Sequence, residues 1–304
     1  MGKDQEHPEK HQAGTAMRST INWHAFWRHH LGEWNGRWTR YSPSGEVVET
    51  FGSTRSFSAD PARMAIAQIN RYRHPDGRSI TEQWKYNIKD HSHKEGFAHP
   101  ASESMRGIAF DTGAAAWLIP HHQGNQFFPF ELFLMRGDIR HSVGVVYGRD
   151  GLLLRTASIR EHRQNPLEIP WSSATEQVDP WMIDGQWQGK ERQICPDLTR
   201  LPVQASRWKW EAIESTEHQS DHFFPDQIIL RCPDRLIKGQ PFSITVYWLE
   251  SKQQLQTIGT SYNAEAILIA IKQQTLTPLP RRMQSNPISM HAISSILKSE
   301  KSRP

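Results

Sequence analysis

Short β-type runs separated by turn residues are the feature that most limits how this chain can fold. Three tight turns are recognisable from their glycine, proline, serine and aspartate content: residues 42–45 (Ser-Pro-Ser-Gly), 74–77 (His-Pro-Asp-Gly) and 148–151 (Gly-Arg-Asp-Gly). In the run that follows the second turn, Trp84 and Tyr86 recur at period two and would share an inward face. This pattern predicts antiparallel hairpins.

The first half of the chain is predicted to form one helix and then eight or nine antiparallel strands. Residues 19–31 carry Trp23, Phe26, Trp27 and Leu31 at helical spacing. Strands are expected over the ranges rich in β-branched and aromatic residues, which are 37–41, 46–57, 63–72, 78–88, 107–118, 127–135, 141–147 and 152–160.

An internal repeat divides the chain into two parts. Residues 33–38 (Glu-Trp-Asn-Gly-Arg-Trp) are matched by residues 186–190 (Gln-Trp-Gln-Gly-Lys), and residues 127–134 are matched in the same order by 223–230. The second copy is shorter between its markers by 57 residues. It is therefore expected to have about six strands, over 187–195, 204–213, 224–232, 242–249, 255–262 and 265–273.

The expected architecture is all-β, with two antiparallel lipocalin-like barrels and a short N-terminal helix before the first. Many short antiparallel strands must close their sheet or cover its edges, and a small barrel does this. The predicted organisation is a disordered tail (1–18), a larger barrel (19–164), a linker (165–184), a smaller barrel (185–275) and a second disordered tail (276–304). With fewer strands, the second barrel is expected to be filled by its own side chains and the first to hold any ligand.

Composition excludes several classes of protein. The 36 Lys and Arg residues against 32 Asp and Glu are scattered, which argues against nucleic-acid binding. The longest apolar run, 113–120, is far shorter than the roughly 20 residues of a membrane span, and the first residues lack a signal-peptide core, so a cytoplasmic location is expected. Cys195 and Cys232 are expected to be free thiols, with a disulfide as the alternative.

Several motifs, taken in their order and spacing, resemble a known family. They are residues 34–49, residues 110–113 with Trp117, residues 224–226, residues 232–233 and residues 239–242. The family consists of cyanobacterial and plastid domain-of-unknown-function proteins built from two lipocalin-like (calycin) barrels. The resemblance covers roughly residues 20–275 and implies a fold and a photosynthetic host, but no activity. A looser likeness of fold links it to the phycobiliprotein lyases, which hold a linear tetrapyrrole in the barrel mouth.

Aromatic and arginine side chains of the first barrel are the candidate ligand contacts. Trp34 and Trp38 either plug the closed end of the barrel or contact a ligand. Arg55 shares a strand face with Phe51 and Phe57, so it is the arginine favoured to point inward and to pair with a ligand carboxylate. The remaining candidates are Arg71, Arg73, Trp84, Tyr86, His121 and His122. The alternative for Arg71 and Arg73 is an outward, solvated position, and for the two histidines an exposed loop.

No catalytic motif can be recognised, so enzymatic activity stays open. The chain lacks the signatures of serine hydrolases, phosphate loops and dinucleotide sites, and its histidines lack the spacing of a zinc helix, so no metal is expected. Glu131 is ambiguous in its strand, with an outward position favoured. We therefore expect a binding or carrier protein for a hydrophobic or amphipathic small molecule, with a tetrapyrrole or other pigment as the candidate. The alternatives are a chromophore lyase or isomerase, and a non-catalytic assembly factor for a phycobiliprotein or other photosynthetic protein.

Overall fold

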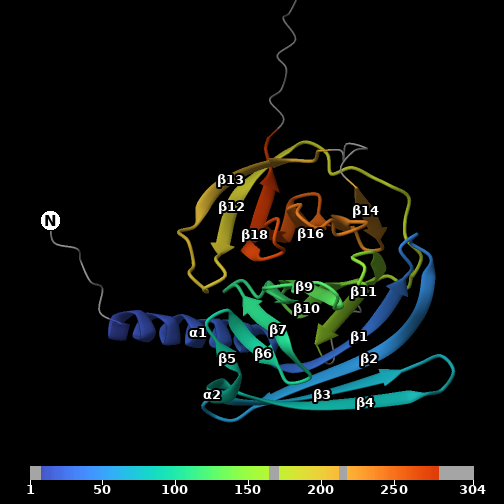
Figure 1. Cartoon of the computed structure of the whole chain (residues 1–304). Coiled ribbons are helices and arrows are strands. Elements are labelled where there is room, and N and C mark those ends of the chain that lie inside the picture. The colour runs from blue at the N-terminus through green and yellow to red at the C-terminus, as the bar shows by residue number, and fades with distance from the viewer. Residues whose placement is uncertain (1–7, 164–170, 212–217, 281–304) are drawn as a thin grey trace, which may run out of the picture.

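The computed structural model describes residues 8–163, 171–211 and 218–280, which form two antiparallel β-sheets and two helices (Figure 1). The predicted all-β class with an N-terminal helix is confirmed. The helices are α1 (Pro8–His30) and α2 (Ile88–His91). Neither of the two described helices has the length and apolar character needed to cross a membrane.

The first sheet has eleven strands in the order β4-β3-β2-β1-β11-β10-β9-β8-β7-β6-β5. Their bounds are β1 Gly32–Tyr41, β2 Val47–Ala59, β3 Ala65–Arg73, β4 Ser79–Asn87, β5 Ser92–His93, β6 Gly96–His99, β7 Ser102–Ala109, β8 Ala115–Leu118, β9 Phe128–Arg136, β10 Ile139–Tyr147 and β11 Leu153–Arg163. The sheet curls until its two ends approach, because Trp84 and Tyr86 of β4 lie with ring centroids 5.2 and 5.8 Å from that of His99 in β6. The result is a nearly closed barrel.

The second sheet has seven strands in the order β13-β12-β18-β17-β16-β15-β14. Their bounds are β12 Gln186–Ile194, β13 Gln204–Lys209, β14 Gln219–Phe224, β15 Ile228–Pro233, β16 Phe242–Ser251, β17 Gln254–Tyr262 and β18 Leu268–Pro278. The described part of the predicted linker, residues 171–184, contains neither helix nor strand. The domain boundaries at 164 and 185 stay predictions.

Two local predictions were wrong. The helix begins at Pro8, not at residue 19, so residues 8–18 are not a disordered tail. A polar sequence gave no apolar pattern there, but tertiary contacts hold the helix, since Arg18 donates to the Asp197 carbonyl at 2.9 Å. The run 107–118 is a hairpin, not one strand, because Gly113 turns the chain at φ +89°. At the C-terminal end β18 extends to Pro278, and the rest of both predicted tails, 1–7 and 281–304, lies outside the described residues.

The first sequence repeat corresponds to a structural one. β1, which carries Trp34-Asn35-Gly36, pairs with the last strand of the first sheet, and β12, which carries Trp187-Gln188-Gly189, pairs with the last strand of the second. A Cβ on Gly36 would lie 2.4 Å from the Arg160 carbonyl, and one on Gly189 would lie 2.0 Å from the Thr275 carbonyl. The two glycines therefore permit close approach of β11 to β1 and of β18 to β12. The second match is not equivalent, because Phe128 and Pro129 lie within β9 whereas Pro225 lies in the turn after β14.

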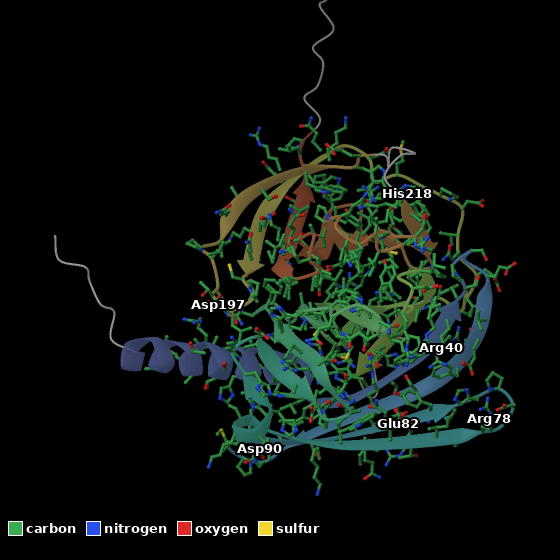
Figure 2. The ribbon with its side chains drawn as sticks, in the orientation of Figure 1. Arg40, Arg78, Glu82, Asp90, Asp197 and His218 are labelled. Atoms are coloured by element: carbon green, nitrogen blue, oxygen red, sulfur yellow. The ribbon has the colours of Figure 1, made fainter. Side chains whose placement is uncertain are left out.

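The two sheets are stacked (Figure 1), and buried apolar side chains, drawn among the sticks of Figure 2, form three clusters. The middle layer lies between the sheets and contains Phe128, Phe130, Leu132 and Leu134 from β9 against Ile244, Val246 and Ile258 of the second sheet. The alternate residues of β9 point into the first barrel, where Phe133 packs with aromatic residues of α1. A third cluster lies on the other face of the second sheet, since its Ile229 and Tyr247 alternate along β15 and β16 with residues of the middle layer. The charged residues Arg78, Glu82 and Asp90 lie at the outer edge of the molecule.

Candidate functional site

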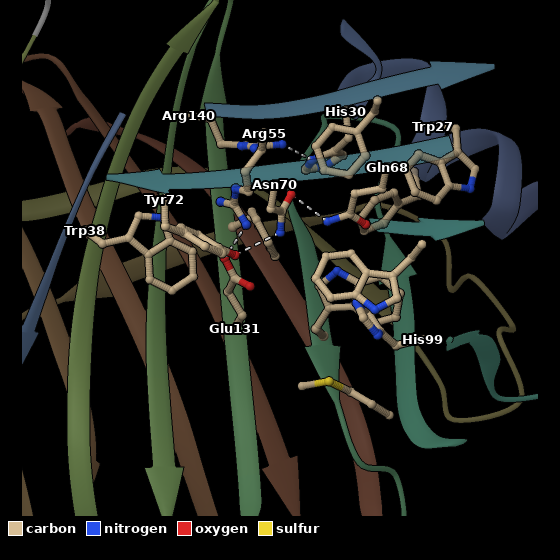
Figure 3. A pocket seen from close by; sticks show the side chains of 16 residues that line it. Trp27, His30, Trp38, Arg55, Gln68, Asn70, Tyr72, His99, Glu131 and Arg140 are labelled. Atoms are coloured by element: carbon tan, nitrogen blue, oxygen red, sulfur yellow. Dashed lines mark hydrogen bonds and ion pairs between the residues drawn. The ribbon is translucent and has the colours of Figure 1, made fainter. Parts of the chain in front are cut away.

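A cavity of about 160 Å³ lies inside the first sheet (Figure 3). Aromatic side chains form its walls and a band of charged and amide groups forms one side. The lining residues are Phe26, Trp27, His30, Trp38, Arg55, Phe57, Gln68, Asn70, Tyr72, Trp84, His99, Met105, Trp117, Glu131, Phe133 and Arg140. Strand alternation places them here, since cross-strand partners such as Trp117 and Glu131 share the inward face.

A buried ion cluster holds the base of this cavity. Arg55, which is 4% exposed, donates from Nε and Nη2 to the two carboxylate oxygens of Glu161, each at 2.6 Å. Its Nη1 donates to Oε1 of Glu131 at 3.1 Å. Arg140 donates from Nε to Glu161 at 2.7 Å and from Nη1 to His30 Nδ1 at 2.9 Å. The cluster therefore joins β2, β9, β10 and β11 and pairs two guanidinium groups with two carboxylates.

Electrostatics keeps the cluster ionised. Burial alone would raise the pKa of Glu161, but the charges and hydrogen bonds of Arg140 and Arg55 outweigh this and lower it to about 2. Burial lowers the pKa of Arg140 to about 10, against the opposing effect of Glu161, so this guanidinium is still protonated at neutral pH. Burial and the charge of Arg140 hold the pKa of His30 well below its ordinary value. His30 is therefore neutral and accepts from Arg140.

The Trp-Asn-Gly motif of β1 packs against the ion cluster. The ring of Trp34, which is fully buried, lies 4.3 Å from the guanidinium carbon of Arg140, close enough for a cation–π contact. A Cβ on Gly36 would lie 2.6 Å from Cγ of Glu161, so only glycine leaves room for that carboxylate side chain. Trp34 does not line the cavity, whereas Trp38 does line it.

A chain of hydrogen bonds runs along β3, which lies on the other side of β2 from β11, the strand that carries Glu161. Tyr86 donates to Gln68 Oε1 at 2.6 Å, Gln68 donates to Asn70 Oδ1 at 3.0 Å, and Asn70 donates to the Tyr72 hydroxyl at 2.9 Å. Trp84 lies beside this row and lines the cavity. These bonds fix the amide orientations and leave the Tyr72 hydroxyl facing the cavity.

Besides the buried Trp27 Nε1, four lining groups have hydrogen-bonding capacity that the described residues do not use. Glu131 is 19% exposed, and no partner within the described chain is found for its Oε2. Trp38 Nε1 and Arg140 Nη2 are buried donors that likewise lack one among these residues. Burial, together with His91, lowers the pKa of His99 to about 4, and its Nδ1 accepts from the Ala101 amide at 3.1 Å, so Nε2 carries the proton. With Trp27 Nε1 included, the lining residues carry one acceptor and four donors that have no partner among the described residues.

The arginines predicted from the sequence divide into one that lies in the site and two that do not. Arg55 points inward, as its spacing from Phe51 and Phe57 indicates, but its three nitrogens already bind protein carboxylates. Arg71 and Arg73 are exposed and do not line this cavity, so their contact with a ligand stays a prediction. The physical reason is strand alternation, because Tyr72 between them takes the inward face.

The two predicted rim histidines do not lie at this cavity. The His121 side chain is 49% exposed, lies 3.1 Å from Glu95, and its backbone bridges to Ile267 of the second part of the chain. His122 stacks on Phe128 with ring centroids 4.2 Å apart. Both residues lie at the junction of the two sheets, because the loop after Pro120 runs toward the second sheet.

The expectation that the first barrel has the roomier interior was wrong. A pocket of about 250 Å³ lies inside the second sheet, against about 160 Å³ in the first. Aromatic side chains of α1 explain the difference, since Phe26 and Trp27 enter the end of the first barrel and occupy its interior. Strand number alone therefore did not decide the free volume.

Sequence reasoning missed most of the buried ion cluster around Arg55. Glu161 and Arg140 were not singled out, and Glu131 points inward where an outward position was favoured. The inward face of β3, with Gln68 and Asn70, was available from the alternation around Tyr72.

Residues 19–166 match the model of the N-terminal domain of a family described as a domain of unknown function, DUF3598. The search of curated proteins found no match. A crystal structure of a DUF3598 protein with unknown function from Nostoc punctiforme is similar, with a TM-score of 0.67, 14% identity, and coverage of 85% of this chain and 99% of that one. At this identity the likeness shows the fold alone, and the predicted resemblance to a cyanobacterial family agrees with it.

Two further solved structures match more weakly. An S-type phycobiliprotein lyase from Guillardia theta has a TM-score of 0.34 and 10% identity, covering 50% of this chain and 98% of that one. A structure of EF1p2_mFAP2b bound to DFHBI has a TM-score of 0.25 and 13% identity, covering 46% of this chain and 98% of that one. Residues 19–166 therefore match the N-terminal domain model of DUF3598, and the chain shares its fold with the DUF3598 protein from Nostoc punctiforme.

Proposed function

We propose that the protein binds a small molecule through a planar ring that enters the cavity of the first sheet. The supporting observation is the set of unused polar groups on an aromatic wall: the Glu131 carboxylate accepts, and the His99, Trp38 and Arg140 nitrogens donate. A ring with an N–H donor and a carbonyl acceptor, as in a lactam, can donate to the Glu131 carboxylate and accept from the donor nitrogens. Rings of a linear tetrapyrrole have this character, so a pigment of this class is the proposed ligand.

The cavity volume limits how such a molecule binds. About 160 Å³ is below the roughly 300–1,000 Å³ of sites for drug-sized ligands, so a single ring enters and the remainder lies outside. Arg55 is fully engaged by Glu161 and Glu131, so ring recognition replaces the earlier expectation that Arg55 pairs with a propionate. Storage or delivery of a pigment to a photosynthetic protein in the cytoplasm is the cellular role that this proposal supports.

Biliverdin and its dimethyl ester test the proposal directly. Absorbance titration of the full chain is expected to give saturable binding of both, because the ester keeps the rings and removes the propionate charges. Glu131→Gln keeps the side-chain size but weakens a charge-assisted hydrogen bond, so the Kd for both probes should rise at least tenfold, about 1.4 kcal/mol. Arg71→Leu, on the exposed face of β3, is the control and should leave the Kd unchanged.

The outcomes separate the three function classes. Equal affinity in parent and Glu131→Gln, or binding of the acid but not the ester, would contradict ring recognition. Covalent conversion of the added pigment would favour the lyase or isomerase alternative. A parent protein that binds neither probe would favour the assembly factor.

A further inference from the structure

The pocket of the second sheet is distinct from the cavity described above. Its volume is about 250 Å³, just below the roughly 300 Å³ at which drug-sized sites begin, which suits a ligand of one small ring. Every lining residue comes from the second part of the chain. These residues are Glu191, Trp208, Ser243, Thr245, Tyr247, Thr257, Gly259, Ser261, Lys272 and Gln274.

A carboxylate and an amide are fixed side by side in this pocket. Glu191 Oε1 lies 3.0 Å from Lys272 Nζ, and its Oε2 accepts from Gln274 Nε2 at 2.9 Å. Gln274 also donates to Ser206 at 3.0 Å and accepts from the Thr257 hydroxyl at 3.1 Å. The one negative and one positive lining group are already paired, so the pocket has no uncompensated charge for an ionic ligand.

Hydroxyl groups cover the wall formed by β16 and β17. Ser243 and Ser261 are cross-strand partners, and Thr245 is the partner of Gly259. A Cβ on Gly259 would lie 2.8 Å from Thr245 Oγ1, so the glycine keeps this part of the pocket open. Hydroxyl groups both donate and accept, and they therefore match a ligand that itself carries several hydroxyls.

Two aromatic rings also line this pocket, Trp208 from β13 and Tyr247 from β16. Trp208 of β13 is half-buried, and its ring centroid lies 5.6 Å from that of Tyr247, with the planes inclined by 41°. Both rings belong to or pack against the apolar cluster that contains Trp187, Leu255 and Leu276. An indole and a phenol ring provide a flat apolar surface with a polar edge.

We infer that this pocket binds a neutral polyhydroxylated ring of the size of one sugar unit. The apolar face of such a ring, made of C–H groups, packs against Trp208. Its hydroxyls donate to the Glu191 carboxylate and the Gln274 carbonyl oxygen, and they exchange hydrogen bonds with the serine and threonine hydroxyls. Charge neutrality excludes a simple anion or amino acid as the better ligand, because either would face an ion pair that is already satisfied.

The experiment uses the full ¹⁵N-labelled chain and follows the indole N–H signal of Trp208, assigned with Trp208→Phe. The probes are methyl α-glucopyranoside, methyl β-galactopyranoside and maltose, with sodium glutamate and inorganic phosphate as charged comparisons. A saturable shift of this signal is expected with at least one sugar and with neither charged compound. Failure of this test would not affect the first-sheet proposal, which is read from pigment absorbance.

Variants then test which groups recognise the ring. Gln274→Leu should weaken sugar binding at least tenfold, and Lys209→Ala, on the opposite face of the strand that carries Trp208, should leave it unchanged. Ser261→Ala breaks no hydrogen bond found within the described residues, so it keeps the fold and should still weaken binding. The inference would be overturned if no sugar gave a saturable shift, or if glutamate or phosphate gave shifts equal to those of the sugars. It would also be overturned if Gln274→Leu and Ser261→Ala both bound sugar with the affinity of the parent protein.

Discussion

Glu161→Gln is the substitution whose effect the buried cluster predicts most sharply. Glu161 is fully buried and accepts three hydrogen bonds from Arg55 and Arg140, and the glutamine amide would instead present N–H groups to one of these donors. The pKa of Glu161 falls from 4.5 to about 2 on folding, and this difference corresponds to about 3 kcal/mol of stability at pH 7. Breaking a buried ion pair generally costs about 3–5 kcal/mol, which agrees.

The stabilisation by Glu161 is expected to decrease at acidic pH. Because folding lowers this pKa, the stabilisation is fully present above pH 4.5 and is lost as the pH falls toward about 2. Urea denaturation of parent and Glu161→Gln should therefore show a difference in free energy of unfolding that is constant from pH 7 to pH 5 and shrinks below that. Glu82→Gln, at an exposed position of β4, is the matched control. A difference below about 1 kcal/mol at pH 7 would refute the cluster's structural role.

Three further predictions concern closure, strand approach and a cavity histidine. Trp34→Ala should destabilise by about 3–5 kcal/mol in thermal melts, and near-parental melting would mean that the ring is exposed. Gly36→Ala should destabilise by at least about 1–3 kcal/mol because its Cβ would meet the Arg160 carbonyl, whereas Gly52→Ala, with contacts no closer than 3.9 Å, should cost much less. The His99 ring, observed by NMR, should stay neutral down to about pH 4, and a midpoint near 6.5 would contradict its burial. Below pH 6.5 the histidine of the unfolded chain binds a proton that the buried His99 does not. The stability of the fold should therefore decrease as the pH falls from 6.5 to about 4.

Much of the fold could be predicted from the residues of its tight turns. The turns ending at Gly45, Gly77 and Gly151 form as predicted, each glycine having a positive φ, because a left-handed position favours glycine strongly. The hairpin around Gly113 was missed since the flanking residues are apolar on both faces, one packing inside the barrel and one between the sheets. Burial on both faces removes the alternation from which a strand end is recognised.

The site was less accessible to sequence reasoning than the fold. The inward position of Arg55 follows from alternation along one strand, which is local information. Its partner Glu161 lies on β11, and only the pairing of β1 with both β2 and β11 brings the two together. The volume of the cavity depends on Trp27 of α1 entering the barrel, which no strand pattern encodes.

A crystal structure of the full chain soaked with biliverdin dimethyl ester tests the central claim most directly. The account predicts electron density for one ring of the pigment between Trp38 and Trp117, with a ring N–H within hydrogen-bond distance of Glu131 Oε2 and a carbonyl near His99 Nε2. Density for the ring elsewhere on the molecule, with the first-sheet cavity unchanged, would contradict it.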